Sequence, residues 1–147
     1  MDNRTYTNDL NTLLSSYQVH YQNLRALHWN IKGSGFFELH LKYEELYTRA
    51  LIIIDELAER ILSIGASPNH RFDQYLENSS IAENPLISGG KAGMNYILSA
   101  QKILLAQERV LLVSSSSMND EGTNALMSDL IREKEKTNWM FAAWLEH

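Results

Sequence analysis

Two histidines flank a glycine-containing break in the segment LHWNIKGSGFFELH. His28 lies five residues before Gly33, and His40 lies five residues after Gly35. If helices on both sides of the break form an antiparallel hairpin, the two imidazoles stand at a similar height above the turn. Glu44 follows His40 by about one helical turn. These side chains supply nitrogen and oxygen ligands only, a set that suits Fe²⁺, Mn²⁺ or Zn²⁺.

Two further carboxylates, Asp55 and Glu59, fall on the same helical face as His40 and Glu44. A polar stripe of this kind is often just the solvated surface of a helix. Asp55 lies eleven residues beyond Glu44, which is about 16 Å along a helix axis, whereas metal–ligand bonds are only about 2 Å long. One chain therefore cannot place all these side chains around one metal ion. If they act together, they do so across a two-fold interface, which creates two equal sites.

Other features of the chain exclude several kinds of site. The 147 residues include no cysteine, which excludes disulfides, thiolate metal sites and cysteine nucleophiles. Without sulfur ligands a structural zinc site is the weaker interpretation, although Zn²⁺ is a strong competitor for nitrogen and oxygen ligands. No Glu-x-x-His motif is present, so a di-iron site of the usual kind inside one bundle is not expected.

Length and hydropathy predict a single domain over residues 1–147 that does not enter a membrane. The first ten residues lack the apolar stretch of a signal peptide, and the run ALIII is too short to span a bilayer. We therefore expect a cytoplasmic protein. The ending LEH, residues 145–147, resembles the start of an expression tag, so we assign no function to His147.

Apolar residues at spacings of three and four predict four long helices. We expect these helices at about residues 7–32, 36–64, 91–113 and either 120–144 or 123–144. A short helix is expected at 72–78, within an irregular crossover. Gly33 should stop the first helix, Ser34 should cap the second, and the segment SSSSMND should break the third. Two helices, a long crossover and two more helices predict an all-α, ferritin-like four-helix bundle.

The segment LHWNIKGSGFFELHLKYEELYTRALIIIDELAERI resembles the signature of the Dps mini-ferritins, the DNA-binding proteins from starved cells. The resemblance covers nearly the whole chain, including the crossover and the late segment NWMFAAWL. It implies a dodecameric hollow shell that oxidises Fe²⁺ between two-fold-related chains and stores the Fe³⁺ product as a mineral. It also favours hydrogen peroxide over dioxygen as the oxidant, and hence protection against oxidative stress.

The resemblance also assigns site residues. His28 and His40 match the family's histidine ligands, and Asp55 and Glu59 match carboxylate ligands that the neighbouring chain supplies. These four residues are the expected catalytic metal ligands. Glu44 is a fifth expected ligand and stands where the family commonly has Asp. Its longer side chain leaves open whether each site holds one or two metal ions.

Several other residues have weaker functional assignments. Trp29 matches an aromatic side chain that takes up oxidising equivalents in the family, and the alternative is an indole packed in an interface. Glu45, like Glu44, is a candidate for mineral nucleation. Asp120, Glu121 and Asp129 are candidates for the lining of an iron pore. For Asp120 and Glu121 the alternative is a helix start that is stabilised by negative charge.

The charge of the chain does not favour the DNA binding that the family name describes. The net charge is −5, and neither end is rich in lysine, so we expect weak or absent DNA binding at neutral pH. Two alternative functions remain at this point. One is a metal-free helical interaction module whose histidines are core residues. The other is a Dps-type protein whose main role is DNA binding.

Overall fold

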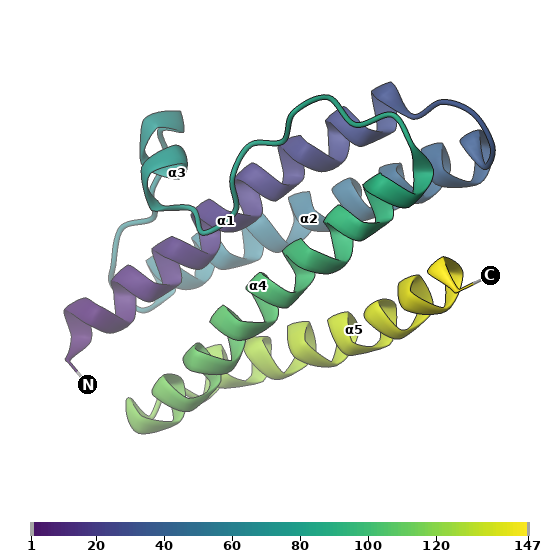
Figure 1. Ribbon diagram of the computed structural model, residues 1–147. Coiled ribbons are helices and arrows are strands. Elements are labelled where there is room, and N and C mark those ends of the chain that lie inside the picture. Colours follow the sequence, from purple (N-terminus) through teal and green to yellow (C-terminus); the bar gives the residue numbers. More distant parts are fainter. Residues whose placement is uncertain (1, 147) are drawn as a thin grey trace.

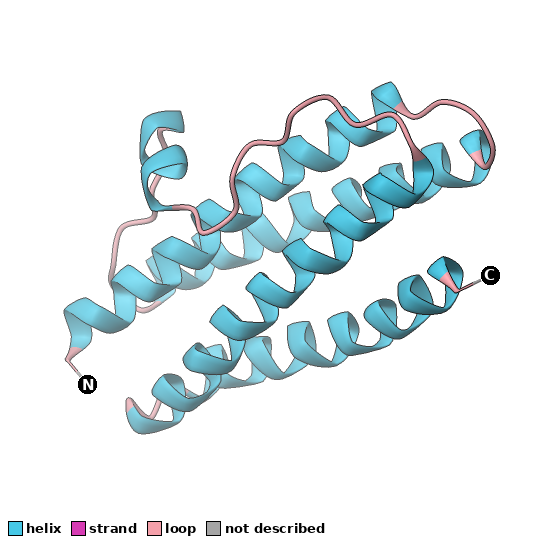
Figure 2. Ribbon diagram, in the orientation of Figure 1, coloured by secondary structure: helices cyan, strands magenta, loops and turns pink. Residues whose placement is uncertain are grey.

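Five helices make up most of the computed structural model, which describes residues 2–146 (Figure 1). They are α1 (Asn3–Asn30), α2 (Phe36–Ser63), α3 (Phe72–Asn78), α4 (Gly90–Ser117) and α5 (Glu121–Leu145). Over the described residues there is no strand (Figure 2). The all-α bundle with a short helix in its crossover is therefore confirmed. His147, the last residue of the predicted tag, lies outside the described residues.

The four long helices form two antiparallel hairpins, α1 with α2 and α4 with α5, and α1 also packs against α4. The crossover leaves the end of α2, carries α3 outside the bundle against α1, and returns along α1 to the start of α4 (Figure 1). One long connection in mid-chain allows both hairpins to join the same bundle.

The bundle core consists of the apolar stripes predicted from the sequence. The predicted core residues that are buried include Leu10, Leu13, Leu14, Tyr17, Leu24, Leu39, Tyr43, Leu57, Ile61, Met94, Ile97, Leu104, Leu111, Leu130 and Phe141. Met127 of α5 is fully buried in this core, whereas Met140 on the same helix is exposed. Residues three or four apart share a helical face, and the α5 stripe runs through Met127 and Leu130.

Two helix starts differ from the prediction. The first helix begins at Asn3 rather than near Thr7, because Asp2 Oδ1 accepts a hydrogen bond of 2.7 Å from the Thr5 amide. The prediction that Ser34 caps the second helix is wrong. Gly35 occupies the cap position in a left-handed conformation, with φ +80° and no side-chain cap.

The serine-rich segment was expected to break the third helix near Val113, but α4 continues to Ser117. The hydroxyls of Ser114, Ser115 and Ser117 donate to carbonyl oxygens three or four residues earlier, over 2.9–3.3 Å. These bonds keep the hydroxyls inside the helical pattern instead of drawing the backbone into a turn. The helix ends only where Asn119 adopts a positive φ of 56°.

A polar cluster holds one end of the bundle together. Arg60 of α2 pairs with Asp120 Oδ1 at 2.8 Å, and the Tyr6 hydroxyl of α1 donates to Asp120 Oδ2 over 2.7 Å. Thr123 donates to the same carboxylate through its amide and its hydroxyl. Burial alone would raise the pKa of Asp120, but the hydrogen bonds from Thr123 and Tyr6 lower it below its usual range. Asp120 therefore connects α1 and α2 to the start of α5.

Gly93 permits close contact between α4 and the α1–α2 hairpin. A Cβ atom at this position would overlap the Tyr43 hydroxyl and lie 3.4 Å from Leu27 Cδ2. The Tyr43 hydroxyl is buried and has no hydrogen-bond partner among residues 2–146. Its place against Gly93 is thus set by packing alone.

We predict that Gly93→Ala lowers the free energy of unfolding by up to about 2 kcal/mol, because an overpacking cost of about 1–3 kcal/mol outweighs the gain in helix propensity of about 1 kcal/mol. The measurement is thermal unfolding, where each kcal/mol shifts Tm by roughly 2–4 °C. In a Tyr43→Phe background the overlapping hydroxyl is absent, so Gly93→Ala should cost much less. An equal loss in both backgrounds would contradict this explanation.

Candidate metal centre

The α1–α2 hairpin brings the two predicted histidines into direct contact. His28 lies in the last turn of α1, and His40 lies in the second turn of α2. The turn between them contains Gly33 and Gly35, both with φ in the left-handed region, where glycine carries no steric cost. The two imidazole rings stack with their centroids 3.7 Å apart and their planes 13° apart.

Each histidine is oriented by the backbone of the other. His28 Nδ1 donates to the His40 carbonyl oxygen over 2.6 Å, and His40 Nδ1 donates to the His28 carbonyl oxygen over 2.8 Å. A carbonyl oxygen only accepts, so both Nδ1 atoms must carry the hydrogen. In the neutral rings, each Nε2 then keeps its lone pair. A hydrogen bond from the other ring nitrogen is the usual support of a metal-binding histidine.

The surroundings hold both rings in place. His28 is 7% exposed, and the Tyr47 ring meets it edge-on at 5.4 Å between centroids. Phe36 stacks on His40 at 5.1 Å. Glu44 Oε1 lies 3.7 Å from His28 Nε2, and its side chain is half exposed. The structure therefore places His28, His40 and Glu44 at one end of the hairpin, as their spacing predicted.

The other two expected ligands lie elsewhere in the same chain. Asp55 and Glu59 are exposed on α2. Asp55 is fifteen residues beyond His40, or about 22 Å along a helix axis. Neither carboxylate has an ion-pair or hydrogen-bond partner among residues 2–146. Within this part of the chain, no group of three or more His, Asp or Glu side chains is placed to hold a metal ion.

Trp29 directly follows His28 in the sequence, and its side chain is 57% exposed. Its ring lies 5.0 Å from the Arg25 guanidinium carbon, which also lies 5.2 Å from the Tyr21 ring. Tyr21 meets Tyr47 edge-on at 6.0 Å. The contact of Tyr47 with His28 depends on the hairpin register, which no local motif reveals.

The remaining acidic candidates have distinct surroundings. Glu45 pairs with Lys42 at 2.8 Å on the surface, and Asp129 pairs with Arg132 at 2.9 Å. Asp120 caps α5 and is held by Arg60, and Glu121 lies in the first turn of that helix. These contacts favour the helix-start alternative over the pore for Asp120.

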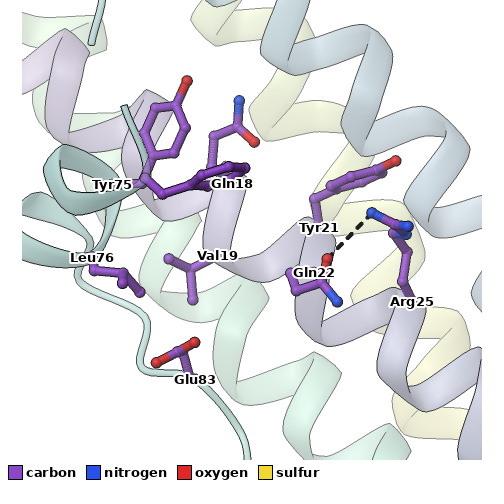
Figure 3. Close-up of a pocket in the computed structure, with 9 residues that line it drawn as sticks. Gln18, Val19, Tyr21, Gln22, Arg25, Tyr75, Leu76 and Glu83 are labelled. Atoms are coloured by element: carbon purple, nitrogen blue, oxygen red, sulfur yellow. Dashed lines mark hydrogen bonds between the residues drawn. The ribbon is translucent and has the colours of Figure 1, made fainter. Parts of the chain in front are cut away.

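A groove of about 410 Å³ lies between α1 and α3 (Figure 3). Its lining is mostly apolar and includes Val19, Tyr21 and Leu76, with a hydrogen bond of 3.2 Å from Arg25 to Gln22 at one end. Phe72 and Leu76 of α3 are both exposed. This groove lies apart from the histidines and carries no set of metal ligands.

Among residues 2–146, no helix combines the length and the apolar character that crossing a bilayer would require.

Comparison with known proteins gives consistent matches over nearly the whole chain. The model of the ferritin-like domain matches residues 7–147. The DNA protection during starvation protein of Porphyromonas gingivalis is 37% identical over 92% of this chain and 85% of its own length.

Two solved structures share the fold closely. The Dps protein of Vibrio cholerae, described as a member of a broad superfamily of ferritin-like diiron-carboxylate proteins, has a TM-score of 0.95 and 49% identity, covering 97% of this chain and 90% of its own. The Dps protein of Bacillus brevis has a TM-score of 0.95 and 34% identity, covering 99% of this chain and 100% of its own. The chain therefore belongs to the ferritin-like family and, within it, to the Dps mini-ferritins.

Proposed function

We propose that this protein is a ferroxidase that oxidises Fe²⁺ at sites shared between two copies of the chain and stores the ferric product in a hollow shell. Membership of the Dps mini-ferritins supports iron storage and protection against oxidative stress in broad terms. The observation that carries the finer proposal is the stacked pair His28 and His40, whose backbone hydrogen bonds leave both Nε2 atoms free to bind metal.

The donor set supports iron as the substrate. Two neutral imidazoles and a carboxylate are a combination that binds Fe²⁺ and leaves positions open for an oxidant. His28, His40 and Glu44 alone do not complete a site in one chain. Asp55 and Glu59 of a second copy would add carboxylate oxygens. Zn²⁺ remains a competitor for the same nitrogen and oxygen ligands.

Exposed apolar side chains support an interface along α2 and α3. Leu51 and Ile52 lie one turn before Asp55, and Leu62 lies one turn after Glu59. Phe72 and Leu76 of α3 are 83% and 53% exposed. Exposed apolar surface of this extent marks a contact between proteins. A two-fold contact between copies would bury it and would bring the free carboxylates of each copy to the histidines of the other.

The proposed reaction consumes two Fe²⁺ ions and one hydrogen peroxide. Two electrons from two Fe²⁺ and two protons convert H₂O₂ into two water molecules and leave two Fe³⁺. Peroxide and Fe²⁺ are the two ingredients of hydroxyl-radical production, so their joint removal is protective. The excess of acidic over basic residues, 18 against 13, suits an interior that gathers and hydrolyses ferric ions. We propose a shell of twelve chains by analogy with the family.

The first test removes both imidazoles. His28→Gly together with His40→Gly should slow Fe²⁺ oxidation by peroxide at least about 100-fold, because loss of the ligands exceeds the 10–100-fold cost of losing their supports. The readout is the absorbance of ferric product after addition of Fe²⁺ and peroxide. His70→Gly, which changes an exposed histidine of the crossover, is the matched control and should keep the native rate. A native rate in the double variant would refute the site.

The second test asks whether a site is shared. A variant without both imidazoles (H28G/H40G) and a variant without both carboxylates (D55N/E59Q) should each be inactive. When the two variants assemble together at random, half of the two-fold pairs are mixed, and each mixed pair contains one complete site. We therefore predict recovery of about one quarter of the native rate. A mixture as inactive as its components would show that the ligands do not meet across an interface.

The third test concerns DNA. The net charge of −5 per chain predicts repulsion from phosphate, so the shell should not retard duplex DNA at micromolar concentration in low-salt buffer without magnesium. A version with a lysine-rich N-terminal extension is the positive control in the same gel. A clear shift of DNA by the unmodified shell would contradict the prediction and favour DNA binding as a main role.

A further inference from the structure

The interior of the bundle contains a buried ion pair far from the histidine pair in sequence. Lys134 Nζ of α5 lies 3.0 Å from Glu108 Oε2 of α4, and both side chains are almost completely buried. The Tyr17 hydroxyl of α1 donates to the same oxygen over 2.6 Å. The ammonium also lies 4.9 Å from the centroid of the Tyr17 ring. Nothing in the proposed iron chemistry uses these groups.

The other oxygen of this carboxylate is unpaired. Glu108 Oε1 is fully buried and has no hydrogen-bond partner among residues 2–146. A buried carboxylate oxygen without a donor is costly, because no protein group replaces its lost hydration. The carboxylate therefore has unused capacity to bind a cation or a donor.

A small cavity of about 30 Å³ lies in the same part of the bundle, with room for about one water molecule. All four long helices contribute polar groups to its lining: Tyr17, His20, Arg49, Gln101, Glu133 and Lys134. Burial lowers the pKa of His20 to about 3, so its ring is neutral at physiological pH. Arg49 and Glu133 neutralise each other, since Arg49 Nε donates to both carboxylate oxygens and Nη2 donates to Oε1.

Carboxylates and neutral imidazoles that face one another from several helices are the groups from which metal sites in bundle interiors are built. Here the interior holds one buried carboxylate with an unpaired oxygen, Glu108, and the cation beside it is the Lys134 ammonium, which is covalently attached to α5. We propose that Lys134 is a specificity determinant whose ammonium fills a cation site on Glu108 and keeps divalent metal ions out of the bundle interior. The proposal does not depend on where, or whether, the protein oxidises iron.

The test replaces the attached cation with space for a free one. In the His28→Gly and His40→Gly background, which removes the surface imidazoles, Lys134→Ala should bind about one more Co²⁺ per chain than the same background with Lys134. Co²⁺ binding is measured by titration calorimetry and by visible absorption, neither of which needs turnover. Bound Co²⁺ should also raise Tm in the Lys134→Ala protein. Lys134→Arg retains a cation and should bind no additional Co²⁺.

The matched control adds Glu108→Gln to Lys134→Ala, which removes the carboxylate but keeps a side chain of the same size. This control should fold and should show no gain in Co²⁺ binding or Tm. If Lys134→Ala binds no more Co²⁺ than this control, the cation-site proposal is refuted, because Glu108 has then simply become protonated. If Lys134→Ala fails to fold alone, recovery of helical structure on refolding with Co²⁺ supports the proposal, and no recovery with Co²⁺ overturns it.

Discussion

The close antiparallel pairing of α1 and α2 is the constraint on which the candidate site depends. A five-residue connection, 31–35, reverses the chain, and it does so with Gly33 and Gly35 in left-handed backbone conformations. This reversal fixes the register in which His28 faces His40. Packing of α4 against the same hairpin, through Gly93 and Tyr43, then holds the pair within the bundle. The imidazoles are thus positioned by the backbone reversal and by packing on both sides of it.

The contacts of the acidic residues separate those that stabilise the fold from those that are available for chemistry. Asp120 is surrounded by Arg60, Tyr6 and Thr123 and joins three helices. Among residues 2–146, Asp55 and Glu59 have no such partners, and they lie among exposed apolar side chains. A carboxylate without a partner on an otherwise apolar face is unfavourable at a buried contact. If a metal ion held by the imidazoles of a second copy bound these carboxylates, that interaction would compensate for the cost of burying them.

Much of the fold could be predicted from the sequence, because helical periodicity and a single long crossover leave few possible arrangements. The short helix at 72–78 was predicted with its observed bounds. The errors concern local competition. Ser34 was expected to cap a helix whose cap residue is Gly35 instead, and the serines after Val113 were expected to end a helix that they extend. A serine hydroxyl can cap a helix or bond a carbonyl three or four residues earlier within it, and the residue type alone does not decide between the two.

The candidate site could likewise be predicted only in part. The contact between His28 and His40 could be predicted from their equal spacing about the glycines. The edge-on contact of Tyr47 with His28 could not. The ion pair of Lys134 with Glu108 was not foreseen, since neither residue belongs to a motif and their contact joins two helices. A lysine or glutamate within a helical segment is usually a surface residue. Only the bundle geometry reveals that these two face inward.

The hydrogen-bond acceptors that set the histidine tautomers are main-chain carbonyls of the two histidine residues themselves. Many metal centres rely on the carboxylate of a separate side chain for this purpose, and a single mutation can remove it. Here every amino acid provides the required oxygen. Many side chains around the hairpin can therefore be substituted during evolution while the imidazoles keep their orientation. The condition is that the register between the two helices is preserved.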